Sequence, residues 1–274
     1  MRIMFGNWKY MFKNFWYVIF CGLVPAVFLA LTFYYRATSS VVRDFCTGNL
    51  QADFLLLLRT CGLIRIDSAL GGIYTALGYL LTVLFAAVLL ALVEKHMRIG
   101  KRTLNGIGRE VKYLLLPTAC IVFLFLALEE ACAIVLSSLV FAILQLKATV
   151  LKYILSVCAF FLVFFVLLYV IEVFYLWLPC LQITGFRPYH AFLYSYRLSA
   201  GVRWKLIASH ALSLAALLAV IGGAAFIRQP VIFYSIAFVF CFFYFSAFFI
   251  RMETAYFQTD KLDREDIIKS YKEL

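Results

Sequence analysis

Six long apolar segments divide this chain, and they constrain its fold more than any other feature. An apolar run of about 20 residues spans the ~30 Å hydrocarbon core of a bilayer as a helix, which pairs its own backbone polar groups. Hydrophobic residues make up 65% of the 274 residues, which excludes an ordinary soluble protein. The sequence therefore predicts an all-α polytopic transmembrane helix bundle. Its six predicted spans are residues 15–35, 70–93, 113–128, 150–179, 205–227 and 231–250.

Positive charge alternates between high and low in the connections between these segments. Of the 25 lysines and arginines, 18 lie before the first span, in 94–112, in 181–205 and after residue 250. The other 7 lie in the alternate connections. Because cytoplasmic connections are enriched in Lys and Arg, the pattern predicts that both termini are cytoplasmic. The net charge of +11 comes from lysines and arginines beside the spans. At that position the expected partners are anionic lipid headgroups, and nucleic acid is not expected to bind.

The spans are expected to pair as three hairpins, each preceded by a basic amphipathic segment at the cytoplasmic interface. These segments are residues 2–14, 95–112 and 187–205. In the middle one, apolar and basic residues fall on opposite helical faces, as in an interfacial helix. A solvated linker beside the membrane is the alternative interpretation. The residues predicted to contact lipid headgroups there are Lys101, Arg102, Arg109 and Lys112.

Two further apolar stretches, residues 50–66 and 131–146, lie in connections on the predicted outer side. Each is short or interrupted by charge, so we expect interfacial or re-entrant elements rather than spans. A crossing by 131–146 would invert the orientation of everything that follows. After the last span, residues 251–274 are predicted to form a cytoplasmic tail helix, with acids early and lysines late as the helix dipole prefers.

Glu172 is the only ionisable residue well inside a long apolar run, and such residues are candidates for function. It lies seven residues before Pro179, while His210 lies six residues after Trp204. At 1.5 Å per residue both are about 10 Å below the same membrane interface. We therefore expect a Glu172–His210 pair, either as a structural hydrogen bond between helices or as a proton-relay site. The nearby hydroxyls are those of Ser209 and Ser213.

The fifth predicted span also carries small residues at every fourth position. Such a ridge lets another helix approach closely, and the sixth span follows after a very short connection. The pattern predicts a tight hairpin but indicates no substrate. The ridge consists of Ala211, Ala215, Ala219 and Gly223.

No sequence motif indicates a metal, a cofactor or a catalytic residue. The chain lacks CxxC and HExxH spacing and has no Gly-rich phosphate loop. The order of Glu129–Glu130, His190 and His210 resembles that of intramembrane CAAX-type proteases, which makes an intramembrane hydrolase the least favoured hypothesis. A disulfide on the predicted outer side is left open among Cys46, Cys61 and Cys132.

The segment before and into the fifth span resembles an uncharacterised bacterial family of six-helix integral membrane proteins. The resemblance lies in the pattern A-x-x-x-S-x-x-L-x-x-G-x-x-W-K, formed here by Ala191, Ser195, Leu198, Gly201, Trp204 and Lys205. It extends with specificity over residues 190–250. The resemblance implies a protein of the bacterial cytoplasmic membrane that acts in envelope upkeep or beside a transporter, without established catalysis.

These observations together favour a non-enzymatic scaffold or accessory subunit of a transport or envelope system. Its expected protein partner is another membrane protein or a second copy of the chain. The alternative hypothesis is a secondary transporter with a polar site at Glu172 and His210.

Overall fold

A computed structural model describes residues 2–48, 52–65, 68–100, 104–227 and 229–260 of the chain. Within these residues every regular element is a helix, as a chain dominated by apolar runs in a bilayer requires. The helices are α1 (Arg2–Lys13), α2 (Phe15–Thr32), α3 (Tyr35–Cys46), α4 (Phe54–Cys61), α5 (Ala69–Ile99), α6 (Ile107–Leu144), α7 (Thr149–Tyr175), α8 (Trp177–Thr184), α9 (Pro188–Ala200), α10 (Arg203–Ala225) and α11 (Pro230–Thr259).

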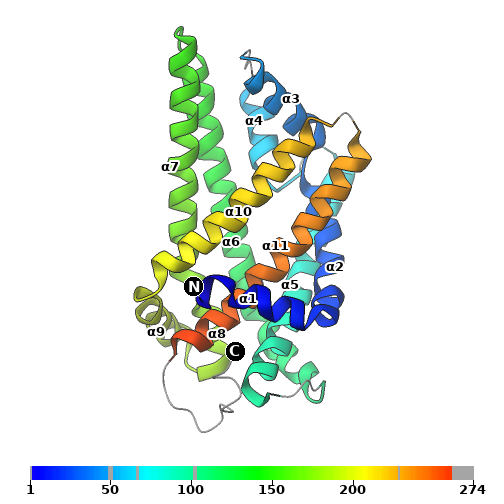
Figure 1. The fold of residues 1–274 in the computed structure, drawn as a ribbon, viewed down its shortest axis with the longest axis vertical. Coiled ribbons are helices and arrows are strands. Elements are labelled where there is room, and N and C mark those ends of the chain that lie inside the picture. Colours follow the sequence, from blue (N-terminus) through cyan, green and yellow to red (C-terminus); the bar gives the residue numbers. More distant parts are fainter. Residues whose placement is uncertain (1, 49–51, 66–67, 101–103, 228, 261–274) are drawn as a thin grey trace.

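Six of the described helices are long and apolar enough to cross a membrane, which confirms the predicted all-α polytopic bundle. They are α2, α5, α6, α7 with its continuation into α8, α10 and α11. Consecutive spans pack as three hairpins, because α2 packs on α5, α6 on α7 and α10 on α11. Figure 1 shows that α1, α8, α9 and the last turns of α11 lie toward the same end of the bundle, whereas α3 and α4 lie at the opposite end. We call these the terminal end and the opposite end.

Helix α11 is the centre of the bundle and packs against α1, α2, α5 and α10. Its contact with α2 is closest at Gly22, where a β-carbon would lie 2.7 Å from Ser246 Oγ and 2.9 Å from Phe242 Cε2. Only glycine allows the two helices to approach this closely. The contact places the first span directly against the last one.

The first and third basic segments contain helices at the terminal end, as predicted. Helix α1 covers the first segment and crosses α11, where Asn7 Nδ2 donates a hydrogen bond of 3.4 Å to the Ala247 carbonyl oxygen. The Trp8 ring packs on Phe243 of α11 with ring centroids 6.3 Å apart. Helix α9 covers most of the third segment and packs on α7 and α8.

The prediction of an amphipathic helix over 95–112 is wrong. Helix α5 continues to Ile99 and ends at Gly100, whose φ of 72° is the left-handed conformation that terminates helices. Helix α6 begins after Gly106, which has a φ of 77°. Residues 95–99 therefore belong to the end of α5 and residues 107–112 to the start of α6, and the two left-handed glycines prevent one continuous helix.

The helix of the third span does not end near residue 128. Helix α6 runs without a break through Glu129–Glu130, so residues 131–144 extend this helix and form no separate re-entrant element. The helix continues because Glu130 has its own partners: its Oε1 accepts hydrogen bonds from the Leu63 and Ile64 N–H groups at 2.7 and 2.6 Å. No Gly or Pro lies between residues 118 and 144 to interrupt it.

Two short segments remain. Residues 52–65 contain the short helix α4, which packs on α6 and α3, and its interfacial or re-entrant character stays a prediction. Residues 251–259 belong to α11 and are not part of a tail helix, because most of their side chains are buried at the terminal end, the apolar Met252, Ala255, Tyr256 and Phe257 among the core residues. The remainder of the predicted tail, 261–274, lies outside the described residues.

The α6–α7 hairpin extends far beyond the other spans at the opposite end (Figure 1). With 38 residues, α6 is about 57 Å long, compared with the ~30 Å hydrocarbon core of a bilayer. Beyond Glu130 the hairpin is contacted by α3 and α4 through a small apolar cluster. That cluster contains Val41, Ala52, Leu56, Leu57, Val140, Leu144 and Tyr153.

Candidate functional site

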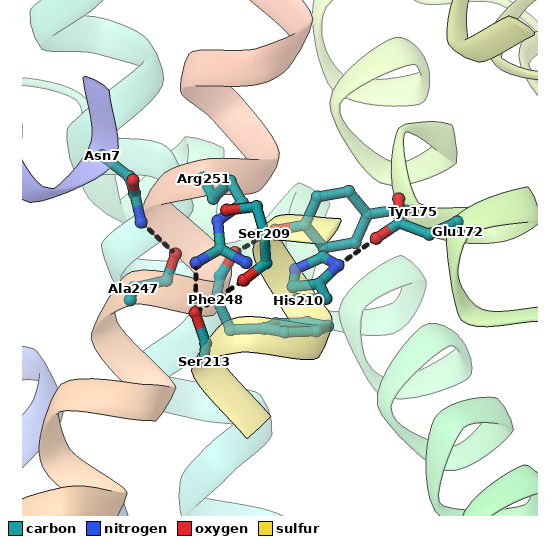
Figure 2. A network of polar contacts seen from close by, with 9 residues as sticks. All are labelled: Asn7, Glu172, Tyr175, Ser209, His210, Ser213, Ala247, Phe248 and Arg251. Carbon is teal, nitrogen blue, oxygen red and sulfur yellow. Dashed lines mark hydrogen bonds and ion pairs between the residues drawn. The ribbon is translucent and has the colours of Figure 1, made fainter. Parts of the chain in front are cut away.

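A buried polar cluster joins α7, α10 and α11, and it contains the predicted Glu172–His210 pair (Figure 2). The Nδ1 atom of His210 contacts the Oε1 atom of Glu172. Only 2% of the His210 side chain and none of the Glu172 side chain is exposed. The predicted contact between Glu172 and His210, which rested on their equal depth below the membrane interface, is therefore present. The role of the pair stays a prediction.

Aromatic rings enclose the imidazole of His210. The Tyr175 ring lies nearly perpendicular to it with centroids 4.4 Å apart, and the Phe248 ring lies 5.2 Å away. The Tyr175 hydroxyl donates a hydrogen bond of 2.5 Å to the Phe248 carbonyl oxygen, which ties α7 to α11. The pair is thereby shielded from lipid and held between three helices.

Arg251 of α11 is the cluster residue that the sequence analysis missed. Its side chain is 1% exposed, and its Nη2 atom donates a hydrogen bond of 2.8 Å to Ser213 Oγ. Ser213 Oγ in turn donates to the Ser209 carbonyl oxygen at 2.9 Å. Arg251 follows the predicted end of the sixth span by one residue, and the apolar residues after it (Met252, Ala255, Tyr256 and Phe257) were the signal that the span continues.

Several polar atoms of the cluster are buried without a hydrogen-bond partner among the described residues. They are Glu172 Oε2, His210 Nε2, and Arg251 Nε and Nη1. Figure 2 shows Glu172 on one side of His210 and Arg251 on the other. A carboxyl and an imidazole in contact can exchange a proton, while a guanidinium is a fixed positive charge. The arrangement can therefore hold helices together or store a proton.

A second ionic group joins the end of α5 to the start of α6 at the terminal end. Glu94 Oε1 pairs with Arg98 Nε at 2.8 Å, and Lys95 Nζ lies 3.6 Å from Glu110 Oε1 and also contacts the Asn105 carbonyl oxygen. Of the residues predicted to contact lipid headgroups, Arg109 and Lys112 are exposed near the start of α6. Lys101 and Arg102 lie outside the described residues.

The predicted ridge of small residues lies on the outer face of α10 rather than against α11. Ala215, Ala219 and Gly223 are exposed and Ala211 is half-buried. A β-carbon at Gly223 would meet nothing within 4 Å. The hairpin with α11 is formed instead by another face of α10, where Leu217, Ile221, Ala224 and Ala225 pack with Phe233. Leu217 and Ile221 bury more apolar surface there than the ridge residues would.

The hydrolase-like residues are not brought together. Glu130 is bonded to the loop between α4 and α5, while His190 lies on α9 at the terminal end. Within the described part of the chain, no three His, Cys, Asp or Glu side chains are placed to hold a metal ion. In that same part, Cys46, Cys61 and Cys132 form no disulfide.

Comparison of the chain with protein-family models, with curated proteins and with solved structures found no match. The resemblance to a six-helix bacterial family therefore stays a prediction from its short motif. The geometry itself establishes the broader class: the chain is a multi-pass integral membrane protein built from six apolar helices.

Proposed function

We propose that this protein is a non-enzymatic scaffold or accessory subunit of a transport or envelope system in the bacterial cytoplasmic membrane. In this proposal both termini are cytoplasmic, and the α6–α7 hairpin is the surface that contacts a membrane-protein partner or a second copy. The exposure of that hairpin is the observation that supports the proposal.

The two helices of the hairpin are the least covered of the spans. In the most apolar 18-residue stretch of each, 17% of the residues are buried, compared with 33–44% in the other four spans. Beyond Glu130 the hairpin passes the end of α2 and still carries exposed apolar side chains, which water would not favour. Those on α6 are Ile134, Val135, Leu139 and Phe141.

The polar cluster supports the same proposal when its role is to hold helices together. Glu172, His210 and Arg251 are all almost fully buried and turn toward one another, so the cluster fixes α7, α10 and α11 at one level. A rigid base of this kind would hold the hairpin at a defined position for its partner.

In-cell photocrosslinking tests the proposal. A photoreactive phenylalanine analogue replaces Ile134, Leu139 or Phe161 on the hairpin, and Phe20 or Leu80 as controls on other spans. The control side chains are as exposed as those on the hairpin, at 69% and 67%. Discrete protein adducts at the hairpin positions alone are the expected result. Adducts to lipid alone at every position would contradict a partner surface.

A secondary transporter remains the second candidate, because the cluster holds buried polar atoms without partners. Intramembrane acids and histidines of this kind form proton relays in transporters. The test is proton entry into proteoliposomes under a potassium diffusion potential, followed with a pH-sensitive dye. Entry that is lost in Glu172→Gln but kept in the control Glu110→Gln would favour the transporter. The scaffold proposal predicts no protein-dependent entry.

A further inference from the structure

One face of α7 begins as the surface on which α10 packs and then continues without a cover. On the packed part, Trp204 of α10 stacks on Phe165 with ring centroids 6.3 Å apart, and His210 contacts Glu172 two turns nearer the terminal end. Toward the opposite end α10 diverges from α7 (Figure 1), so α10 does not cover the rest of this face. Only the half nearer the terminal end is therefore occupied by a helix of this chain.

The uncovered half has the spacing of a seam between two helices. Its apolar residues follow one another at intervals of four, three and four, which keeps them on one side of the helix for about 17 Å. A seam with this spacing receives the side chains of one partner helix as knobs into holes. We call it the α7 seam, and its residues, which are 40–72% exposed, are Val150, Ile154, Val157 and Phe161.

The α7 seam extends past the level at which the neighbouring spans end. The α6–α7 hairpin reaches beyond the connection between α10 and α11 at the opposite end (Figure 1), and the first turns of α7 lie in that extension. These turns carry Val150 and Ile154. A bilayer with a ~30 Å hydrocarbon core does not supply lipid chains to cover apolar side chains at that level. The seam therefore fits a protein helix that extends as far as α7 does.

The tip of the hairpin is positively charged and has no acid of its own. No Asp or Glu lies between residues 131 and 171. Lys147 is exposed in the connection before α7 and Lys152 is half-buried in its first turn, and neither forms an ion pair within the described part of the chain. A partner with Asp or Glu at this level would be attracted, whereas a second copy inserted in the same direction would bring its own lysines there. The charge therefore favours a different protein over a second copy.

We propose that the α7 seam binds one apolar helix of a different membrane protein, and that acidic side chains at the end of this helix pair with Lys147 and Lys152. The partner helix is longer than the hydrocarbon core, because it follows α7 beyond the ends of the other spans. This inference rests on the proposed function, since it names the partner of the hairpin surface.

Photocrosslinking at two adjacent residues tests whether the occupant is a helix in the α7 seam. Phe161 lies in the seam and Leu162 is turned about 100° away from it, yet the two are equally exposed at 62% and 63%. A photoreactive phenylalanine analogue at Phe161 or Ile154 should give one discrete protein adduct in cells, and at Leu162 that adduct should be lost. The partner peptide should come from an apolar segment of another protein with Asp or Glu at its end.

The other outcomes separate this inference from the proposed function. Equal adducts at Phe161 and Leu162 would overturn the helical seam and leave the hairpin surface in place. An adduct between two copies of this chain would overturn the assignment to a different protein. No protein adduct at any position of the hairpin would overturn both the inference and the proposed function.

Reversing the charge at the tip tests the acidic complement. Lys147→Glu combined with Lys152→Glu should lower the adduct yield at Phe161 about tenfold, because two attractions become repulsions. Lys147→Arg with Lys152→Arg keeps both charges and should crosslink as the wild type does. Arg36→Glu is the matched control, since it reverses an exposed charge at the same end but on α3. Yields are compared per amount of protein in the membrane. An unchanged yield after the lysine reversal, or an equal loss in Arg36→Glu, would overturn the acidic complement.

Discussion

The imidazole of His210 lies edge-to-face against the Tyr175 ring, with centroids 4.4 Å apart and ring planes at 83°. Because Nδ1 of the same imidazole contacts Glu172, one side chain of α10 is held at two points of α7. This contact links the second and third hairpins, and it is more specific than apolar packing because it fixes both the rotation of α10 about its axis and its depth beside α7.

Replacing His210 with alanine should destabilise the bundle strongly. The variant leaves the Glu172 carboxyl buried without its partner, and breaking a buried pair in this way costs about 3–5 kcal/mol. Unfolding in mixed micelles of a mild detergent and dodecyl sulfate measures the loss. The control is His190→Ala on α9, where the histidine is exposed. Equal stability of the two variants would contradict the proposed link.

Replacing Gly22 with alanine should also destabilise the protein, although alanine is the better helix former. The added carbon would lie 2.7 Å from Ser246 Oγ, so α2 and α11 must separate. Overpacking of this kind costs about 1–3 kcal/mol. Gly223→Ala is the control, because nothing lies within 4 Å of its β-carbon and helix propensity favours alanine by up to ~1 kcal/mol. The prediction fails if both variants shift stability in the same direction.

The Cys61 thiol should react slowly with maleimide at pH 8. Burial raises the pKa of Cys61 to about 11, the neighbouring Ser137 hydroxyl opposes that rise, and the charge of Glu129 adds to it. A raised pKa leaves about one thiolate per thousand thiols at pH 8, so the rate should increase about tenfold per pH unit toward pH 11.

Glu130→Ala should make the same thiol react faster at pH 8. It removes the acceptor for the Leu63 and Ile64 N–H groups, which frees the loop that follows Cys61. Glu130→Gln keeps an acceptor oxygen and should react nearly as slowly as the wild type. Mass spectrometry of labelled peptides gives the rates, and an unchanged rate in the alanine variant would show that the loop is held by other contacts.

Labelling from the two sides of the membrane tests the predicted orientation. Cys46 is exposed at the end of α3, so a membrane-impermeant maleimide should label it in intact spheroplasts. A cysteine placed at Arg109 should be labelled only after permeabilisation. Cys46→Ser gives the background, and the reverse pattern would place both termini outside.

The sequence predicted the six helices and one polar contact for definite physical reasons. Apolar length decides whether a helix crosses a bilayer, and the rise per residue converts sequence distance from an interface into depth. Glu172 and His210 could therefore be paired from Pro179 and Trp204 alone. The same reasoning could not decide which face of α10 is buried, because Ala215 and Leu217 are both acceptable to lipid.

The errors arose where charged residues were interpreted as marking the end of a helix. Glu129–Glu130 and Arg251 lie inside helices, because neighbouring segments supply or accept their hydrogen bonds: the loop after α4 for Glu130 and Ser213 for Arg251. Such partners come from distant parts of the chain and leave no local pattern. The segment 95–112 was the opposite case, since two left-handed glycines, Gly100 and Gly106, divided a segment whose charge pattern indicated one helix.

The place of α11 in the bundle has a consequence for biogenesis. Helices α1 and α2 are made long before α11, yet both pack on it, through Asn7 with Ala247 and Gly22 with Ser246. During synthesis the first hairpin must therefore wait in the bilayer with an uncovered face until the final span is inserted. A stop in translation before Pro230 would leave that face open, which makes the nascent chain a substrate for insertion chaperones and quality-control proteases.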